Sequence, residues 1–230
     1  MAKKQDKLTP FELADFTTFD LDGTICDPRD GIVRCFQHAL ERVGCALPPE
    51  AELLKHIGPP LHASVTALLD TADRELIMRA VVCYRKRFVS IGMFENRVYP
   101  GIIELLAALH HQSYRLYVVT SKPTAFAREI IKHFRLEMYF HNVHGSELDG
   151  TRAEKNDLIA HVLEREQIQP DQGIMIGDRA QDIKGAIANG VRPIGVLWGY
   201  GSREELTRAG ASLLCETPET LAREFCWVMQ

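Results

Sequence analysis

Four aspartates stand at two points of the chain where their carboxylates can meet. Asp20 and Asp22 are two residues apart behind a β-favouring run, and Asp178 and Asp182 flank the start of a predicted helix. Two carboxylates about 4 Å apart repel each other by roughly 4 kcal/mol at an effective dielectric constant of about 20, so a cluster of four either takes up protons or binds a cation. Oxygen ligands favour Mg²⁺. We predict a magnesium site of Asp20, Asp22 and Asp178, with Asp182 orienting the waters of the metal or Lys155.

The first pair of aspartates suits the transfer of a phosphoryl group. Mg²⁺ neutralises the phosphate dianion that otherwise repels an attacking carboxylate. We therefore assign Asp20 as the nucleophile, which forms an aspartyl-phosphate. Asp22 is expected to protonate the leaving oxygen and then to deprotonate the attacking water. Gly23 gives the turn an unhindered backbone.

Three further residues are candidates for binding the phosphate. The Thr120 hydroxyl and the amides of the Thr120, Ser121 and Lys122 turn can donate to phosphoryl oxygens. Lys155 opens a predicted helix from which its ammonium can reach both the phosphate and Asp20. We count Thr120 and Lys155 as catalytic beside the two aspartates. Each residue alone is as readily explained by a turn, a helix cap or a solvated side chain. Their joint occurrence in this order predicts a site.

Short apolar runs precede these polar groups and predict the strands that position them. The apolar runs are residues 114–119, 173–176, 194–197 and 212–215, and residues 16–19, Phe-Thr-Thr-Phe, form a β-favouring run before the first aspartates. Apolar stripes at helical spacing lie between them, for example at 102–109 and 158–163. The alternation predicts an α/β fold, a Rossmann-like doubly wound parallel sheet with helices on both faces. The ligand site of such a sheet lies at the carboxyl ends of its strands.

The segment from residue 28 to residue 97 shows helical stripes and no convincing strand. It predicts an all-helical cap inserted into the chain, so that residues 1–27 and 98–230 form the catalytic core. Asp27 is expected as the N-cap of the first cap helix and Pro28 as its first residue. Because both connections emerge beside the catalytic acids, we expect the cap to close over the strand ends and to select the leaving group.

The composition argues against several classes of protein. The 230 residues include 27 Lys and Arg against 31 Asp and Glu, a net charge of −4, so a binder of nucleic acid polymers is not expected. No apolar run approaches the roughly 20 residues that span a bilayer, and the N-terminal stretch lacks the apolar core of a signal peptide. The six cysteines contain no C-x-x-C pair and favour neither zinc nor disulfides. We expect a cytoplasmic protein without membrane contact.

The acids, the threonine and the lysine stand in the order of four known motifs. These are Phe19-Asp20-Leu21-Asp22-Gly23-Thr24, Thr120-Ser121, Lys155 and Gly177-Asp178-Arg179-x-x-Asp182. Together they resemble the motifs of haloacid dehalogenase-like hydrolases, and the helical insert is similar to the cap of the phosphoglycolate phosphatase-like branch. The resemblance implies the roles assigned above for the matched residues. Since true dehalogenases lack the second acid, the presence of Asp22 favours phosphoryl transfer.

Four shorter stretches resemble a bacterial 5′-nucleotidase subgroup of that branch. They are residues 56–61, 94–101, 145–152 and 199–202. The resemblance implies a Mg²⁺-dependent phosphomonoesterase with a 5′-nucleotide as first-choice substrate and phosphoglycolate or another small phosphate ester as runner-up. A phosphomutase shares the catalytic residues, and a catalytically silent phosphate-binding protein is the alternative of another class. The expected partner is a small phosphorylated metabolite, and the oligomeric state is not predicted.

Two sets of basic cap residues are candidates for contacting the rest of the substrate. Arg34 and His38 lie one helical turn apart on the first cap helix, and Arg85, Lys86 and Arg87 form a basic run. A solvated helix face explains Arg34 and His38 better. The basic run is better explained as solvated charges near a helix C-terminus, where the helix dipole favours cations. We therefore assign none of the five to the substrate.

Overall fold

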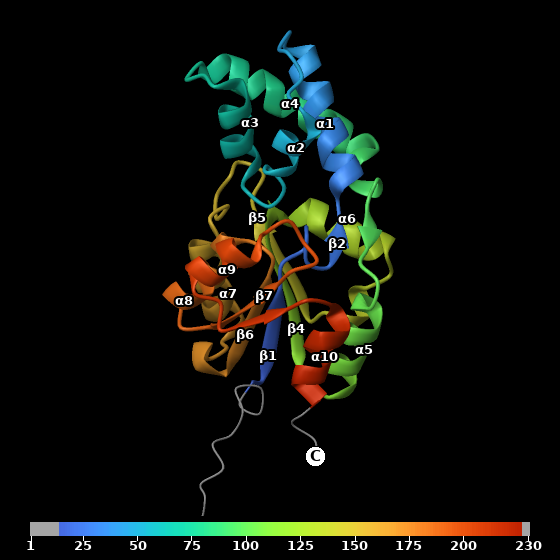
Figure 1. Ribbon diagram of the computed structural model, residues 1–230, viewed down its shortest axis with the longest axis vertical. Coiled ribbons are helices and arrows are strands. Elements are labelled where there is room, and N and C mark those ends of the chain that lie inside the picture. Colours follow the sequence, from blue (N-terminus) through green and yellow to red (C-terminus); the bar gives the residue numbers. More distant parts are fainter. Residues whose placement is uncertain (1–13, 227–230) are drawn as a thin grey trace, which may run out of the picture.

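The computed structural model describes residues 14–226 as a parallel sheet flanked by helices, with a helical layer beyond one end of the strands (Figure 1). The sheet has six strands in the order β5-β4-β1-β6-β7-β8, and every neighbouring pair is parallel. The strands are β1 (Phe16–Phe19), β4 (Arg115–Pro123), β5 (Asn142–Ser146), β6 (Gly173–Gly177), β7 (Arg192–Val196) and β8 (Leu213–Cys215). The predicted doubly wound α/β fold is confirmed.

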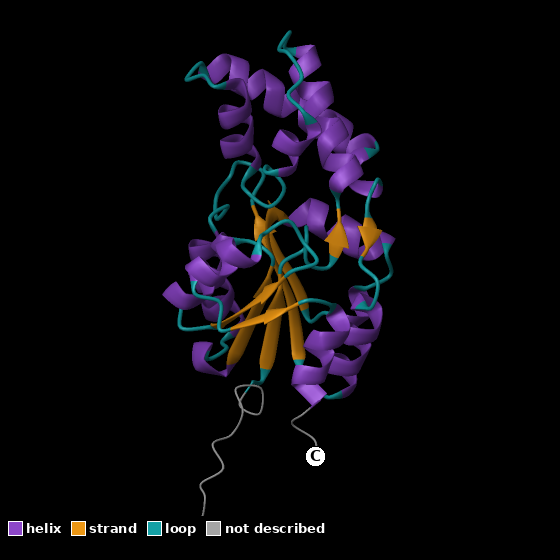
Figure 2. Ribbon diagram, in the orientation of Figure 1, coloured by secondary structure: helices purple, strands orange, loops and turns teal. Residues whose placement is uncertain are grey.

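Helices cover both faces of this sheet (Figure 2). One face carries α5 (Ile102–His111), α6 (Thr124–His133) and α10 (Pro218–Cys226), and the other carries α7 (Lys155–Glu166), α8 (Ala180–Ala188) and α9 (Arg203–Ala209). Short 3-10 turns lie at Glu137–Tyr139 and Pro170–Gln172. Along β4, Leu116 and Val118 pack in the core on the α5 side, whereas Tyr117 and Val119 pack against α7. Both faces of the strand are therefore apolar, which explains why unbroken apolar runs marked the strands.

β5 is the strand that the sequence analysis did not predict. Its five residues, Asn142–Ser146, are mostly polar or small, and it forms one edge of the sheet beside β4. His144 is buried in this strand, and its Nε2 lies 2.8 Å from Oε1 of Glu166 on α7. Burial lowers the pKa of His144, with Glu166 opposing. Because β5 is held by this polar pair and contains no apolar run, its sequence did not indicate a strand.

Four helices form a layer beyond the carboxyl ends of the strands (Figure 1). They are α1 (Arg29–Arg42), α2 (Glu50–Leu54), α3 (Leu61–Leu69) and α4 (Arg74–Ser90), followed by the 3-10 turn Gly92–Phe94. The chain enters and leaves this layer through an antiparallel two-stranded ribbon of β2 (Cys26–Asp27) and β3 (Arg97–Val98), in which Cys26 pairs with Val98. The two connections therefore lie side by side.

The start of α1 differs from the prediction by one residue. Pro28 takes the N-cap position, and Arg29 is the first helical residue. Asp27 still contributes, because its Oδ1 accepts a hydrogen bond from the Arg29 backbone N–H at 3.0 Å. One amide of the first turn, which has no partner within the helix, is thereby satisfied.

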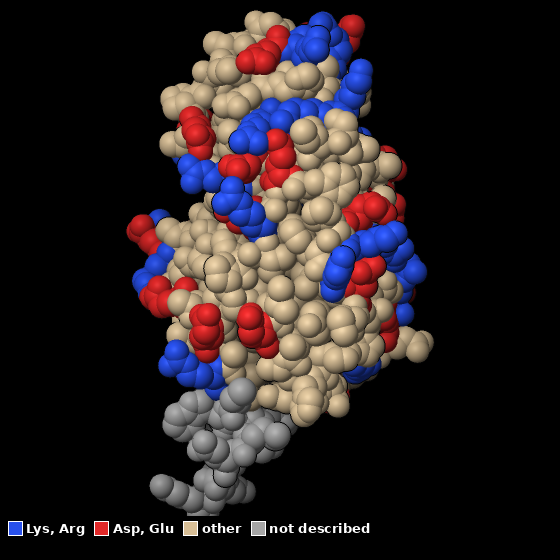
Figure 3. Space-filling model, turned by 90° about the vertical axis from the view of Figure 1, so that its right-hand side faces the viewer, with Lys and Arg blue, Asp and Glu red and all other residues tan. Residues whose placement is uncertain are grey.

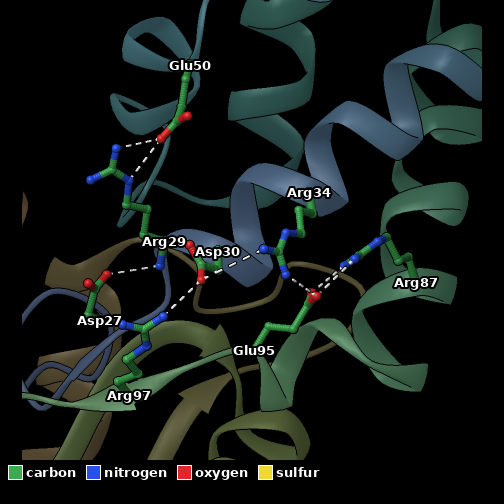
Figure 4. Close-up of polar contacts among 8 residues, drawn as sticks. All are labelled: Asp27, Arg29, Asp30, Arg34, Glu50, Arg87, Glu95 and Arg97. Carbon is green, nitrogen blue, oxygen red and sulfur yellow. Dashed lines mark hydrogen bonds and ion pairs between the residues drawn. The ribbon is translucent and has the colours of Figure 1, made fainter.

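Ion pairs join the base of the helical layer (Figure 4). Arg34 Nη1 lies 2.6 Å from Glu95 Oε1, and Arg87 Nη1 lies 2.7 Å from Glu95 Oε2. Hydrogen bonding from Arg87 lowers the pKa of Glu95, and Arg34 adds to the effect. On the solvent side, Arg97 Nη2 lies 3.3 Å from Asp30 Oδ2. The Glu95 carboxylate thus connects α1, α4 and the segment that leads to β3.

Charged side chains of both signs share the surface. On the face shown in Figure 3, Lys and Arg lie interspersed with Asp and Glu. Such a face offers no continuous positive stripe for a nucleic acid backbone. Within residues 14–226, none of the helices combines the length and the apolar character needed to cross a membrane.

Replacing Gly31 by alanine is expected to destabilise the protein, although alanine is favoured over glycine by about 1 kcal/mol inside a helix. A β-carbon at Gly31 would lie 2.1 Å from the carbonyl oxygen of Gly92 and 2.9 Å from that of Glu95. These are backbone atoms, so α1 itself has to move. We expect a net loss of about 2–3 kcal/mol in the free energy of unfolding, measured by urea denaturation.

Gly44→Ala is the control for this prediction. Nothing lies within 4 Å of a β-carbon added at Gly44, whose φ is +80°. Only backbone strain of about 1 kcal/mol is expected there. Equal losses at Gly31 and Gly44 would contradict the packing argument.

Candidate active site

The turn after β1 brings the first two aspartates to the carboxyl edge of the sheet. Phe19, the last residue of β1, pairs with Val118 of β4 on one side and with Ile176 of β6 on the other. The Asp20 backbone N–H then donates to the Ile176 carbonyl at 2.9 Å. The residues that follow in the three strands therefore share one edge of the sheet.

Gly23 is required by the geometry of this turn. Its φ is +90°, in the left-handed region that glycine alone adopts without strain. A β-carbon there would lie 2.3 Å from Oδ2 of Asp178. Any other residue would strain the turn and displace the Asp178 carboxylate.

Three buried carboxylates form an acidic cluster at this edge. Asp20, Asp178 and Asp182 each offer one oxygen, and these oxygens lie within 4.8 Å of one another. Asp178 Oδ2 accepts from the Tyr200 backbone N–H at 2.8 Å, and Asp182 Oδ2 accepts from the Arg179 backbone N–H at 3.0 Å. Burial raises the pKa of Asp178, and the charges of Asp182 and Asp20 raise it further. The cluster therefore has both the donor atoms and the excess negative charge that suit Mg²⁺.

Lys155 is the cation inside this cluster. Its Nζ lies 2.7 Å from Asp20 Oδ1 and 2.9 Å from Asp182 Oδ1, and it donates to the Val119 carbonyl at 2.8 Å. Burial alone lowers the pKa of Lys155, but the carboxylates of Asp182 and Asp20 raise it above its ordinary value. One ammonium offsets only part of the negative charge that three carboxylates can carry, so the cluster can still attract a cation.

Asp22 points away from the acidic cluster. Its Oδ2 lies 2.8 Å from Nζ of Lys122, and both side chains are less than a tenth exposed. Burial raises the pKa of Asp22, an effect that Lys122 partly offsets. The sequence analysis placed Asp22 at the metal and used only the backbone amide of Lys122. The structure brings together the other three acids and gives Asp22 a lysine of its own.

The end of β4 supplies the hydroxyl and the turn expected to bind phosphate. Thr120 pairs with Gly145 of β5, but the next pair is Pro123 with Ser146, so a bulge removes Ser121 and Lys122 from the ladder. Thr120 is buried, and its Oγ1 accepts from the Lys122 backbone N–H at 3.3 Å. The hydroxyl proton of Thr120 stays available for a ligand. The bulge turns the polar residues after Thr120 toward the acids.

A cavity lies between the acids and the helical layer. Asp20, Asp22, Thr120, Ser121 and Lys122 form its polar end, and residues of α1, α3, α4, α6 and the loop between α2 and α3 form most of the rest. The aromatic and aliphatic lining residues include Ile32, Phe36, Leu61, Tyr84, Phe88 and Phe126. The cavity therefore combines a charged end beside the nucleophile with a mostly aromatic and aliphatic remainder, a combination typical of ligand sites.

Arg85 is a cavity residue that the sequence analysis did not assign to the substrate. It lies on α4, its Nη2 donates to the Leu148 carbonyl at 2.7 Å, and its buried Nε has no hydrogen-bond partner among residues 14–226. Arg34 and Arg87 are instead paired with Glu95. Sequence periodicity could not show which of these arginines faces the cavity, because the packing of α1 and α4 decides which side of each helix lines it.

The chain matches known proteins along most of its length. The model of the family described as haloacid dehalogenase-like hydrolase matches residues 17–196. A Pseudomonas aeruginosa protein named 5′-nucleotidase is 49% identical over 190 residues, which cover 82% of this chain and 85% of that protein. Tyrosine-protein kinase PtkA of Mycobacterium tuberculosis is 37% identical over 90% of this chain and 70% of that protein. More distant relatives, at 25% and 30% identity, include proteins named phosphoglycolate phosphatase.

A solved structure with the same fold is also similar to this chain in sequence. The crystal structure of a predicted phosphatase from Clostridium acetobutylicum superposes with a TM-score of 0.89 at 39% identity. The superposition covers 93% of this chain and 99% of that chain. The resemblance drawn from the sequence motifs is thereby confirmed at the level of fold and family.

Lys155→Met is expected to destabilise the metal-free protein by about 3–5 kcal/mol near pH 7, because it leaves Asp20 and Asp182 buried without their cation. Urea denaturation measures the loss. Burial raises the pKa of Asp182 while Lys155 opposes the rise, so without Lys155 the carboxyl takes up a proton more readily. Since a raised pKa in the folded state stabilises it as the pH falls, the loss should shrink toward acidic pH.

Lys184→Met, at an exposed position of α8, is the control for the loss of a lysine charge. A surface substitution of this kind changes stability by about 0.5 kcal/mol or less. A Lys155→Met loss as small as that of the control, or one that grows toward acidic pH, would contradict the role of Lys155 in the cluster.

Proposed function

The chain belongs to the haloacid dehalogenase-like hydrolase family and is one of its phosphatases, and we propose that it hydrolyses small phosphate monoesters with Mg²⁺ through an aspartyl-phosphate on Asp20. The observation that carries the proposal is the buried contact of Lys155 with both Asp20 and Asp182, beside Asp178. This contact supports the proposal, because the Asp20 carboxylate lies next to two other buried carboxylates and also lines the cavity. A cytoplasmic protein whose partner is a small phosphorylated metabolite is part of the same proposal.

In the first step Asp20 attacks the phosphorus atom. Lys155 holds Oδ1 of Asp20, which leaves the other carboxylate oxygen for the attack. The bond from phosphorus to Asp20 forms as the bond to the leaving oxygen breaks, and Asp22 gives the leaving oxygen its proton. Thr120, Ser121 and Lys155 donate to the remaining phosphoryl oxygens.

In the second step water regenerates the nucleophile. Asp22, now ionised, takes a proton from the water that attacks the aspartyl-phosphate, and inorganic phosphate leaves. A bound Mg²⁺ supplies positive charge against the phosphate oxygens in both steps. Asp20 and Asp178 are proposed to hold it, with Asp182 orienting its waters and Lys155. Asp22 stays a proposed ligand, although its carboxylate contacts Lys122 here.

The cavity supports a 5′-nucleotide as the first-choice substrate. Phe36, Tyr84 and Phe88 from the helical layer and Phe126 from α6 offer aromatic surface to a base and a ribose. The P. aeruginosa relative carries the matching name. Arg85 supports the runner-up, phosphoglycolate, because a guanidinium with a free buried N–H suits the carboxylate of that small ester.

We propose that residues 28–97 act as a mobile cap on a core of residues 1–27 and 98–230. Hydrogen bonds that cross the seam include those from Arg85 to the Leu148 carbonyl and from Arg179 to the Ile57 carbonyl at 2.6 Å. The two connections run through the short β2–β3 ribbon, so a small rotation there moves the far side of the cap considerably. Closure would exclude water and let the aromatic lining choose the leaving group.

The proposal is tested by phosphate release from a panel of nucleotides, sugar phosphates and phosphoglycolate. We expect the highest kcat/KM with 5′-nucleotides, and Asp20→Asn should abolish turnover because an amide cannot form the acyl-phosphate. Substrate binding should persist, since the amide has nearly the same size as the carboxylate. Asp157→Asn, at an exposed position of α7, is the matched control and should keep wild-type turnover.

Two outcomes would reject this assignment. Turnover of Asp20→Asn within a few fold of wild type would remove Asp20 as the nucleophile. Isomerised phosphate esters without free phosphate would indicate a phosphomutase, which uses the same residues but retains the phosphoenzyme.

Chelation by EDTA is expected to abolish activity, Mg²⁺ to restore it and Ca²⁺ to fail. The acidic cluster offers few ligands in a tight space, which suits the octahedral Mg²⁺, whereas Ca²⁺ accepts more ligands at longer distances and can misplace nucleophile and phosphate. The readout is initial phosphate release at fixed substrate. Full activity in EDTA would contradict the metal requirement without touching the assignment of Asp20.

A further inference from the structure

A chain of contacts connects the helical cap to Asp22. Nζ of Lys122 lies 2.8 Å from Oδ2 of Asp22 and 4.4 Å from the centre of the Phe88 ring on α4. Both Lys122 and Asp22 expose less than a tenth of their side chains, and Phe88 is buried. The ammonium therefore lies between an acid of the core and an aromatic ring of the cap.

The two oxygens of Asp22 have different surroundings. Oδ2 is held by Lys122, whereas Oδ1 is buried without a hydrogen-bond partner among the described residues. Asp22 also lines the cavity beside Asp20. This arrangement, with one oxygen fixed and the other open to the reacting group, suits a carboxyl group that transfers protons.

Stability alone does not account for the pair. Two charges taken out of water cost several kcal/mol each, and well-packed apolar residues of similar volume are often as stable. Lys122 is fixed at this place by the bulge in β4, where its backbone N–H donates to Thr120 Oγ1 at 3.3 Å. Ring contact with Phe88 adds attraction between the cation and the π-face. The local fold thus orients Lys122 toward Asp22 from both sides of the seam.

We propose that Lys122 is a positioning residue that fixes the Asp22 carboxyl for proton transfer to the leaving oxygen, and that Phe88 keeps Lys122 in place. The cap then contributes to the chemistry and not only to the choice of substrate. This inference rests on the proposed function, in which Asp22 gives a proton to the leaving oxygen as the phosphorus–oxygen bond breaks.

The test uses substituted phenyl phosphates of nearly equal size whose phenols differ in pKa. kcat/KM covers the steps up to release of the phenol, so the later hydrolysis of the aspartyl-phosphate does not contribute. A general acid accelerates a reaction by about 10²- to 10⁴-fold and matters most for poor leaving groups. If Asp22 is misplaced, kcat/KM should therefore fall more steeply as the pKa of the phenol rises.

Lys122→Met removes the charge and keeps the length of the side chain. We expect kcat/KM to fall by about tenfold or more for the least acidic phenol and by less than about threefold for p-nitrophenyl phosphate, since part of the general-acid contribution is lost. Phe88→Leu should steepen the dependence in the same direction by a smaller amount. In the Lys122→Met background, Phe88→Leu should steepen it no further.

Phe36→Leu is the matched control, because it removes another aromatic ring of the same cavity that is not in contact with Lys122 in the described structure. It should lower kcat/KM evenly across the series. Thermal unfolding checks that each variant is folded. If Lys122→Met does not fold, the test is made with Phe88→Leu alone.

Three results separate the possible failures. An even loss across the series in Lys122→Met, or no loss, would overturn the positioning role. Steepening by Phe88→Leu that persists in the Lys122→Met background would overturn the link through Lys122. If the wild-type protein releases no phenol from any of these esters while folded and supplied with Mg²⁺, the proposed function itself fails.

Discussion

The site depends on the buried ion pairs of the Lys155 ammonium with Asp20 and Asp182. The ammonium touches Asp20 after β1, Asp182 in the first turn of α8 and the Val119 carbonyl of β4. Lys155 itself is the first residue of α7. Burying these charges costs several kcal/mol for each ion, and the contacts offset the cost only when their geometry is fixed. The register of β1 with β4 and β6 provides that geometry, because it delivers the strand ends to one edge.

This constraint divides the molecule into two kinds of surface. The core side of the cavity carries the charged and hydroxyl groups, whose positions are set by the sheet, and the side from α1, α3 and α4 is mainly aromatic and aliphatic. Exchange of apolar side chains of similar volume costs little stability. Removal of one member of a buried ion pair costs much more, because the remaining charge stays buried without a partner. Apolar residues on this side of the cavity, other than Phe88 with its contact to Lys122, can therefore vary without disturbing the acids.

Much of this was predictable from the sequence. The interior strands contain apolar or β-favouring runs, and the acids follow β1 and β6 directly, so both the fold and the meeting of Asp20 with Asp178 could be inferred. β5 was missed because a polar pair, His144 with Glu166, replaces an apolar run. The side-chain contact of Lys122 was missed because the direction of a side chain in a bulge is decided by the neighbouring strand and by the cap, which spacing alone does not show.

The same contrast explains how two aspartates of one turn can have separate roles. Asp20 lies in the cluster with Lys155 and the other two carboxylates, whereas Asp22 contacts Lys122, which lies against Phe88 of the helical layer. Gly23 follows Asp22 with a left-handed backbone, and because it has no β-carbon it leaves room for the Asp178 carboxylate. Burial raises the pKa of Asp22, which favours the protonated form that an acid requires. Identical side chains two residues apart are thus distinguished by the lysine that each one meets.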